Sequence, residues 1–510
     1  MKAIKGLLVY IGIIIAVLFI VCFAIFGFMY FFPTFRLFGI GVIHADEQSN
    51  IEKIIMSEYS GYDNIELNLS SNKININVVT VEDSQDISYN LDLSVFGIST
   101  DITEYRIIRS VDVKDRILKI NLSVTEPNGW ISNNSSYMNI NVPANKSYDI
   151  LTKTQSGSVS LGQGETALKC NKLTVNTKGG NLNIGSLAES GVLNLEALNL
   201  TTTSGKMDFS SINTINVSNK MLINANRGYF KFNNINADID VRGTGVEISA
   251  QTIKCPSTGL TFMAENGTFN VKSLNSLGGA ENTIVTEYGN VNIEKVIGDT
   301  GIITTYGNIN IGIAKDDLIL ESTHGKIDVV EVSGDIRASS HYGDINVQKY
   351  FQSGNFVSEQ GEIRVESAGD YEHGRVTKIK SKDGNVFVIN KVNQLNLNIT
   401  GTAKAEIKFT TIKTGLTDAT TYQNTIKTGT HGRCELYLPV RSVNDDLYFK
   451  FTAKGNITGA LSGLEGEYLE HGMNVVSKDE PQYYPNKDAE VLWFTCCSFY
   501  CEGNIHFGSH

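Results

Sequence analysis

The chain has 510 residues, with 54 Asp and Glu against 43 Lys and Arg and a formal net charge of −11. Such an acidic surface repels phosphate backbones, which argues against nucleic acid as a partner. A hydrophobic content of 41% with 19% charged residues is typical of a globular protein, and 7 cysteines in a chain of this length exclude a disulfide-dense scaffold.

An apolar segment without any charged side chain occupies residues 7–32. At about 1.5 Å per residue in a helix, it is long enough to cross a hydrocarbon core of about 30 Å. A cleavable signal peptide has a shorter apolar region followed by small residues, whereas bulky residues fill 35–38, so we expect an uncleaved transmembrane helix. Because Lys2 and Lys5 precede the segment, residues 1–6 are predicted to be a cytoplasmic tail and the bulk of the chain extracytoplasmic. The alternative, a buried core helix, would be expected to show a polar face.

A short phrase recurs after residue 150: a glycine followed by a polar, an apolar, a polar and an apolar residue. Examples are GNVNI at 289, GNINI at 307 and GKIDV at 325, which follow one another every 18 residues. Elsewhere the spacing is wider, and a degraded unit around Val246 and Ile248 fills the longest gap. The glycines that start the units are Gly157, Gly180, Gly205, Gly228, Gly267, Gly289, Gly307, Gly325, Gly343, Gly361 and Gly384.

Aligning the units on the glycine gives three apolar columns, at two and four positions after it and five positions before it. Strict alternation around a glycine predicts two short strands joined by a turn, each with one buried face. We expect the glycine to provide a backbone angle that other residues reach only with strain.

A unit of about 20 residues cannot bury its own apolar face and must stack on its neighbours. The sequence therefore predicts an all-β fold, a parallel β-helix or closely related β-solenoid. The hexapeptide pattern of left-handed β-helices is absent, which favours the right-handed kind. A β-propeller is the alternative, but its blades need about 40 residues each.

The predicted organisation has four parts beyond the transmembrane helix. Residues 33–63 are expected to be a stalk, and 64–150 a β-rich N-terminal cap whose strands lack the glycine period. Residues 151–400 are predicted to form about 12 solenoid coils, and 401–510 a C-terminal β-rich cap or small domain, because a solenoid needs both open ends covered.

The repeats resemble the bacterial putative-adhesin domain, whose members carry many Ser/Thr-x-x-Gly-Asp/Asn-Ile/Val-x-Val units. The lead-in YMNINVPANKSYDILTKTQSGSVSL, residues 137–161, is similar to that family's entry into its first repeat. The resemblance covers roughly residues 65–400 and implies an envelope-associated surface protein without a shared catalytic motif. This chain differs in having Asn more often than Asp after the glycine and in its long C-terminal extension.

Two columns on the predicted outer surface are candidate binding residues. Stacked aromatic rings one position before the glycine could cradle sugar rings, and a polar column nearby could bond hydroxyls. The alternative is that stacked like residues only stabilise neighbouring coils. The aromatic column is Tyr288, Tyr306, His324 and Tyr342, and the polar column is Asn292, Asn310, Asp328 and Asn346.

A catalytic alternative needs clustered carboxylates, and the best cluster places Asp344 over Glu362, with Asp328 nearby. Two carboxylates about 5 Å apart could serve as acid and base of a polysaccharide lyase or hydrolase. The competing interpretation is a solvated charged face relieved by Lys326 and Arg364. Since no hydrolase, metalloprotease, phosphate-binding or calcium-loop motif is present, we predict a protein without catalytic residues.

The C-terminal tail offers cysteines and histidines at close spacing: Cys496, Cys497, Cys501, His506 and His510. Zinc sites usually separate their ligand pairs more widely. A disulfide of Cys501 with a tail neighbour or with Cys434, or free thiols, are the alternatives. No metal or cofactor is predicted, and Cys170 and Cys255 are expected to be small apolar fillers in connectors.

Taken together, these features predict a single-pass cell-membrane protein whose extracytoplasmic β-solenoid acts as a cell-surface adhesin or envelope scaffold. The expected partners are the membrane, through the N-terminal span, and a cell-wall polymer, glycan or envelope protein, with no nucleic acid. The alternative is a polysaccharide-modifying enzyme built on a β-helix.

Overall fold

The computed structural model describes residues 2–32, 36–37, 40–62, 64–101, 103–133, 135–164, 166–185, 191–368, 375–391, 394–409, 422–437, 448–459, 482–483 and 496–507. The chain divides into two compact units, Met1–Asn233 and Asn234–His510.

The first unit contains a long N-terminal helix, a short 3-10 helix and strands of a single hydrogen-bonded network. Its elements are α1 (Lys2–Phe31), β1 (Gly41–Gln48), β2 (Glu52–Ile54), η1 (Met56–Tyr59), β3 (Asn64–Ser70), β4 (Asn75–Val81), β5 (Ile87–Ser99), β6 (Arg106–Lys114), β7 (Ile117–Thr125), β8 (Gly129–Asn133), β9 (Tyr137–Pro143), β10 (Ser147–Thr154), β11 (Val159–Leu161), β12 (Cys170–Thr177), β13 (Leu182–Ile184), β14 (Val192–Leu195), β15 (Ala197–Thr202), β16 (Lys206–Asp208) and β17 (Thr214–Cys255), which continues into the second unit.

Most parallel strands of the first unit form two rows, while β14 pairs in parallel with the start of β17. One row runs β7–β3–β10–β12–β15–β17, and the other runs β9–β4–β11–β13–β16–β17. The registers place like residues side by side, as in the row of Leu118, Ile65 and Tyr148. The parallel stack therefore already begins within 64–150, the range predicted to be the N-terminal cap.

Antiparallel strands lie at the start of this stack. β5 pairs with β1, β2, β8 and β9, and β6 pairs with β7, all antiparallel. The range 33–63, predicted as a stalk, thus contributes two strands to a sheet. Val42 and Ile54 are buried in that sheet, which is the physical reason that this short polar segment is ordered on β5.

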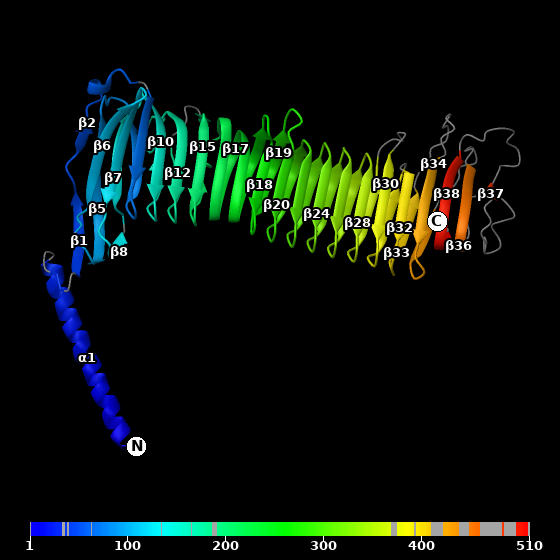
Figure 1. The fold of residues 1–510 in the computed structure, drawn as a ribbon, viewed down its shortest axis with the longest axis horizontal. Coiled ribbons are helices and arrows are strands. Elements are labelled where there is room, and N and C mark those ends of the chain that lie inside the picture. Colours follow the sequence, from blue (N-terminus) through cyan, green and yellow to red (C-terminus); the bar gives the residue numbers. More distant parts are fainter. Residues whose placement is uncertain are drawn as a thin grey trace. The chain divides into compact units, whose positions relative to one another are not determined.

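The helix α1 is a long rod at the N-terminus (Figure 1), and most of the apolar side chains of residues 11–25 are exposed. Its segment Ile11–Phe31 has a hydropathy of 3.1, and by length and composition it can cross a bilayer. Phe23 is 73% exposed and Phe31 is 77% exposed, which in water would be a large unburied apolar surface. The predicted long apolar helix is confirmed.

The second unit is built from the end of β17 and from strands that repeat in pairs. Its further elements are β18 (Leu260–Ala264), β19 (Thr268–Ser276), β20 (Asn282–Thr286), β21 (Val291–Ile297), β22 (Thr300–Thr304), β23 (Ile309–Ala314), β24 (Leu318–Ser322), β25 (Ile327–Val332), β26 (Ile336–Ser340), β27 (Ile345–Tyr350), β28 (Gly354–Ser358), β29 (Ile363–Ser367), β30 (Val376–Ser381), β31 (Val386–Asn390), β32 (Gln394–Ile399), β33 (Lys404–Phe409), β34 (Tyr422–Thr428), β35 (Arg433–Tyr437), β36 (Tyr448–Gly459), β37 (Gln482–Tyr483) and β38 (Cys496–Phe507).

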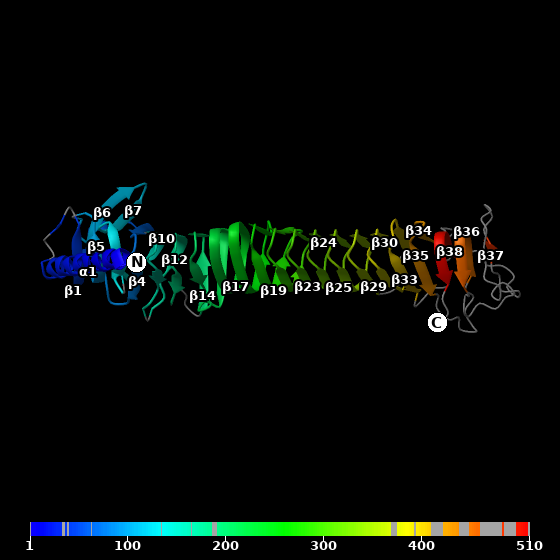
Figure 2. The same ribbon diagram turned by 90° about the horizontal axis from the view of Figure 1, so that it is seen from below.

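The even-numbered strands β18 to β34 pair in one parallel row and the odd-numbered strands β19 to β35 in another. Figure 2 labels β24 and β30 along one side of this unit and β23, β25 and β29 along the other. β38 pairs in parallel with β34, β35 and β36, while β37 pairs antiparallel with β36. The predicted parallel β-solenoid is confirmed; its right-handed sense and the predicted domain limits stay predictions.

The three apolar columns of the repeat form the core. Every residue in them is at most 6% exposed. The degraded unit around Val246 and Ile248 also stacks in register with the next coil, because Ile248 pairs with Phe269 and Ala250 pairs with Val271. The columns are Val159, Leu182, Met207, Phe230, Phe269, Val291, Ile309, Ile327, Ile345, Ile363 and Val386; Leu161, Ile184, Phe209, Phe232, Val271, Ile293, Ile311, Val329, Val347, Val365 and Val388; and Val175, Leu200, Ile223, Phe262, Ile284, Ile302, Leu320, Ala338, Phe356 and Ile379.

A buried hydroxyl closes many of the glycine turns. Thr177 Oγ1 accepts a hydrogen bond of 2.8 Å from the Gly180 amide, and Thr304 Oγ1 donates one of 2.6 Å to the Gly307 carbonyl. The side chain three positions before the glycine therefore satisfies backbone groups that the turn leaves unpaired inside the core. This contact explains the Ser/Thr of the repeat.

The reason for the glycine differs from the one predicted. None of the eleven repeat glycines has a φ between +20° and +160°, so a left-handed backbone angle is not what they provide. Instead, a Cβ at Gly325 would lie 1.9 Å from the carbonyl oxygen of Gly307, and one at Gly343 would lie 2.1 Å from that of Gly325. At nine of the eleven positions the glycine allows adjacent coils to approach at this corner, where a side chain would collide with the neighbouring backbone; at Gly228 and Gly267 it would collide with buried side chains instead.

Gly325→Ala is therefore expected to lower the free energy of unfolding of the second unit by about 3 kcal/mol, because the coils must separate to admit the methyl group. Urea denaturation followed by circular dichroism measures the change.

Gly301→Ala is the matched control. A Cβ at Gly301 meets only the Asn282 carbonyl oxygen at 3.8 Å, so this substitution should be neutral or stabilise by up to about 1 kcal/mol. Equal losses from both substitutions would show that close coil approach is not the reason for glycine.

Buried thiols make the free energy of unfolding decrease at alkaline pH. Cys255 is fully buried at the end of β17, and burial, with the nearby Asp238 carboxylate, raises its pKa to about 12. The unfolded chain releases this proton near pH 8.5. The contribution of the buried thiol to the free energy of unfolding is therefore complete below that pH, and it is lost as the pH rises toward 12, by about 1.4 kcal/mol per pH unit.

Relative to wild type, Cys255→Ala should gain about 2 kcal/mol in unfolding free energy between pH 7.5 and 10. Urea curves of the reduced proteins test this, and parallel pH profiles would contradict it.

Candidate functional site

The aromatic column predicted from the sequence forms a continuous ring stack in the second unit. Centroid distances are 4.9 Å for Tyr288–Tyr306, 4.6 Å for Tyr306–His324 and 4.7 Å for His324–Tyr342, with interplanar angles of 4°, 13° and 18°. These separations equal the spacing of neighbouring strands, so the stack follows directly from the 18-residue period. The rings lie in the turn before each repeat glycine, and all four side chains are exposed.

Backbone bonds fix each ring on the preceding coil. The amide of Tyr306 donates to the Glu287 carbonyl at 2.8 Å, and the amide of His324 donates to the Thr305 carbonyl at 2.7 Å. A side-chain hydrogen bond with Glu287 raises the pKa of Tyr288. At the other end, the ring of His341 lies edge-on to Tyr342 at 4.3 Å, and its Nδ1 lies 3.3 Å from Glu359 Oε1. Sequence reasoning missed this extension, because His341 is offset by one position from the aromatic column.

This geometry changes what the aromatic column can do. Rings stacked this closely cover one another's faces, so a sugar ring cannot lie on the faces between them. The stack presents ring edges instead, and Tyr288, Tyr306 and Tyr342 remain 51%, 48% and 44% exposed. Phenol hydroxyls and imidazole nitrogens at a spacing near 5 Å can exchange hydrogen bonds with a repeating polar partner.

The polar column forms a second ladder on the strand that follows the turn. Asn310 Nδ2 donates to Asn292 Oδ1 at 2.7 Å, and Asn292 Nδ2 donates to Asn270 Oδ1 at 2.6 Å. At Asp328 the ladder changes, because a carboxylate only accepts: Asn346 Nδ2 donates to it at 3.1 Å. Sequence reasoning placed these four residues in one column but not Asn270, which lies 22 rather than 18 residues before Asn292.

A shallow groove of about 550 Å³ runs along this amide ladder. The ladder residues Asn292, Asn310 and Asp328 line it, with Lys272 and Glu294 beside them. Asn346 lines a different groove of about 400 Å³, where the Arg364 guanidinium lies 4.6 Å from the ring centre of Phe387. The four tyrosine and histidine rings line neither groove, so the two predicted columns are separate surfaces, one at a corner and one on a sheet face.

The carboxylates of the catalytic alternative have structural partners. Asp344 Oδ1 accepts the backbone amide of Glu362 at 2.8 Å, and Glu362 pairs with Arg364 at 3.1 Å. Asp328 forms an ion pair with Lys326 at 3.0 Å. The Asp344 contact joins two coils, whereas the ion pairs of Glu362 and Asp328 lie within one coil, and none of these contacts favours a catalytic pair.

The same contact explains why Asn or Asp follows the repeat glycine. Asn290 Oδ1 accepts the amide of Asn308, and Asn308 Oδ1 accepts the amide of Lys326, both at 2.8 Å. A short acceptor at this position satisfies the free amide of the next coil. The residue that the resemblance singles out therefore has a structural role here.

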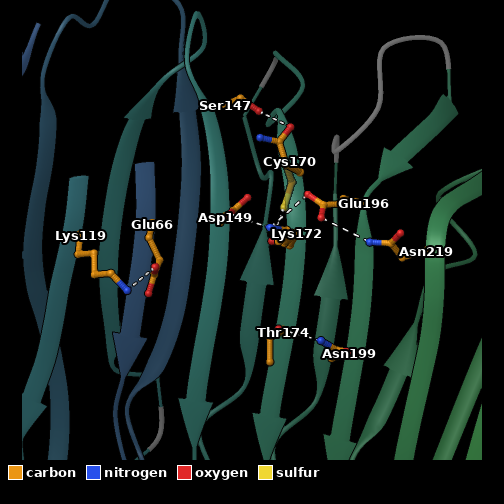
Figure 3. A network of polar contacts seen from close by, with 11 residues as sticks. Glu66, Lys119, Ser147, Asp149, Cys170, Lys172, Thr174, Glu196, Asn199 and Asn219 are labelled. Carbon is orange, nitrogen blue, oxygen red and sulfur yellow. Dashed lines mark hydrogen bonds and ion pairs between the residues drawn. The ribbon is translucent and has the colours of Figure 1, made fainter. Parts of the chain in front are cut away.

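The first unit carries a row of charges that the sequence did not predict (Figure 3). Lys119 pairs with Glu66 at 2.7 Å, and Lys172 lies 3.1 Å from Glu196 and 3.9 Å from Asp149. Burial alone would raise the pKa of Glu66, but hydrogen bonds from Lys119 and Asn68 outweigh it and lower the pKa. Burial raises the pKa of Asp149, and the neighbouring acids add to this. The row aligns only through the strand register, because its members share no fixed sequence spacing.

The tail cysteines do not assemble a metal site among the described residues. No group of three histidine, cysteine or acidic side chains lies close enough to hold an ion there. Cys434 and Cys501 are free and fully buried, and burial raises the pKa of Cys501 to about 12, so it stays a thiol at neutral pH. The side chains of Cys496 and Cys497, and His510, lie outside the described residues. Cys170 and Cys255 are buried as predicted, but in strands β12 and β17 rather than in connectors.

A family model matches part of the chain. Residues 62–300 match the family model described as Toastrack DUF4097. The adhesin-like repeat that the sequence motifs predict is confirmed by this match together with the solenoid. No curated protein matches the chain.

One solved structure that aligns with the chain is that of a putative cell adhesion protein from Clostridium sporogenes. The alignment covers 91% of this chain and 99% of that one, at 10% identity and a TM-score of 0.18. A TM-score this low does not establish a shared fold, so the alignment carries no weight for function.

Proposed function

On the premise that residues 62–300 are a Toastrack DUF4097 domain, we propose that the protein is a membrane-anchored β-solenoid that acts outside the cytoplasm as a cell-surface adhesin or envelope scaffold, without catalysis. The observation that carries this proposal is the pair of exposed ladders, the ring stack and the amide ladder. Both repeat the same chemistry once per coil, which suits a polymer or an extended protein partner better than a small metabolite.

Membrane anchoring is supported by α1, whose candidate span Ile11–Phe31 carries exposed apolar side chains along most of its length. Lys2 and Lys5 precede the span, while Asp46 and Glu47 follow it. The positive flank favours the cytoplasm, which would leave both units on the outer side. We propose that the helix is retained rather than cleaved, because its apolar region is longer than that of a signal peptide.

Binding without catalysis is supported by the way polar groups are used. Asp344 and Glu362 are engaged in contacts between or within coils. The ring edges of the tyrosines and the amides along the groove, in contrast, are accessible. Such a surface can bind a polymer rich in hydroxyl or amide groups through many similar contacts of modest strength.

The binding proposal predicts that replacing Tyr288, Tyr306 and Tyr342 together by Ser weakens binding to purified cell-wall polysaccharide by at least about tenfold, equivalent to about 1.4 kcal/mol. Removing the rings deletes the row of phenol hydroxyls and leaves the core columns intact. Co-sedimentation of the detergent-solubilised full chain with the polymer measures the effect.

The matched control replaces Ile303, Ile313 and Ile319 by Ser. These side chains are exposed by 44%, 36% and 46% in the same coils, so the control removes similar exposed apolar area away from the rings. Binding by the control should stay near the wild-type level. Unchanged binding by the folded tyrosine variant would contradict the proposed ring surface.

Anchoring predicts that the full chain stays with membranes after an alkaline carbonate wash, whereas a chain lacking residues 2–32 is released into the soluble fraction. The apolar area of α1 favours the bilayer by far more than peripheral contacts can. Protease added to intact cells should digest the solenoid, since the proposal places it outside. A full-length chain that washes off, or that is protected in intact cells, would contradict the anchor or its orientation.

A further inference from the structure

An aromatic cluster joins the end of α1 to the sheet of β1 and β5. The ring centres of Phe26 and Phe96 lie 6.1 Å apart, and those of Tyr30 and Phe96 lie 6.0 Å apart. Tyr30 also lies 5.4 Å from the ring of His44 on β1. The last turns of the helix therefore lie against the outer face of this antiparallel sheet rather than ending short of it.

These contacts set the depth of the sheet relative to the helix. Phe26 precedes Phe31, the last residue of the candidate span, by five residues, which is about 7–8 Å along the helix axis. If α1 crosses the bilayer, Phe26 lies within the apolar layer, and Phe96 in contact with it lies at the level of the membrane interface. The sheet edge and the outer end of the helix then occupy the same layer.

The strand register extends this face beyond the helix. Phe96 pairs with His44 and Ser132, and Ile98 pairs with Val42 on β1 and Trp130 on β8. Directly paired residues project to the same side of a sheet. Val42 is buried, but Trp130, on the opposite side of β5 from β1, is 74% exposed.

The exposed indole of Trp130 suits a position at a membrane interface. Tryptophan is enriched where a protein meets the membrane interface, because its ring is apolar while its N–H remains polar. A cation also lies nearby, since Lys73 Nζ donates to the Gly129 carbonyl at 3.1 Å, next to Trp130 in the chain. An ammonium near this part of β8 can complement anionic lipid headgroups.

We propose that the outer face of β1, β5 and β8 docks on the lipid bilayer, with Trp130 inserted into its interface beside α1. This inference rests on the proposed membrane anchor and adds a second contact to it. The occupant is the bilayer itself, because the face is continuous with the helix that enters it. Docking would restrict tilting of the sheet about the short segment that follows α1.

The test uses the full chain reconstituted in vesicles of phosphatidylcholine and phosphatidylglycerol. The chain has two tryptophans, so Trp493→Phe leaves Trp130 as the single indole. Lipids brominated near the headgroup end of the acyl chains should quench its emission by at least about twofold, and aqueous iodide should quench it little.

The matched control moves the indole within the same unit. Leu222 is 37% exposed on β17, which lies further along the parallel row that starts with β7 and β3. The control chain carries Leu222→Trp together with Trp130→Phe and Trp493→Phe, so that its single indole lies on β17. Its emission should be quenched by iodide and not by the brominated lipid.

Each outcome bears on a different statement. Vesicle-bound chain in which Trp130 is as accessible to iodide as the Leu222→Trp indole would overturn docking while the anchor stands. Trp130 shielded from iodide but unquenched by brominated lipid would overturn docking in favour of a protein contact. A chain that does not float with the vesicles would overturn the anchor and docking together.

Discussion

The structure depends on how closely neighbouring coils approach at the glycine corner. The carbonyl oxygen of Gly307 lies where a side chain on Gly325 would begin, and Gly343 repeats this relation with Gly325. Because the backbones meet there, coils stack in one register with little freedom to slide. The buried hydroxyl of Thr304, or its equivalent three residues before the glycine, satisfies the polar groups that this approach would otherwise strand in the core.

A fixed register turns each sequence column into a physical ladder. Inside, it gives the stacked apolar columns; on the surface, it gives the amide ladder of Asn292 and Asn310 and the ring stack through Tyr306. A ladder therefore does not by itself indicate binding, because identical neighbours stabilise one another. What distinguishes the two candidate surfaces is that ring edges and groove-lining amides stay accessible after the contacts between coils are made.

The periodic features of the fold and the long apolar helix could be predicted from the sequence, whereas contacts set by non-periodic long-range pairing could not. The core columns and the ring stack follow from spacing alone, since a fixed repeat places Tyr288 beside Tyr306 in any parallel stack. The role of the repeat glycine was predicted incorrectly. A left-handed turn and a close approach of two backbones both require glycine, so the sequence alone does not distinguish them. The strands β1 and β2 and the charge pair of Lys119 with Glu66 were missed, because their partners are set by long-range pairing without a period.

The length of the ring stack limits what one molecule can hold. It spans the coils from Gly289 to Gly343, and the equivalent positions on either side are Asn266 and Gln360, which carry no ring. Four rungs at about 4.8 Å cover only about 14 Å of a partner. A contact of that size through ring edges is modest in strength, so adhesion through this surface would draw its affinity from many copies acting together. The proposed anchoring by α1 would provide that condition, because chains confined to one membrane would present their ladders to the same polymer at a high effective concentration.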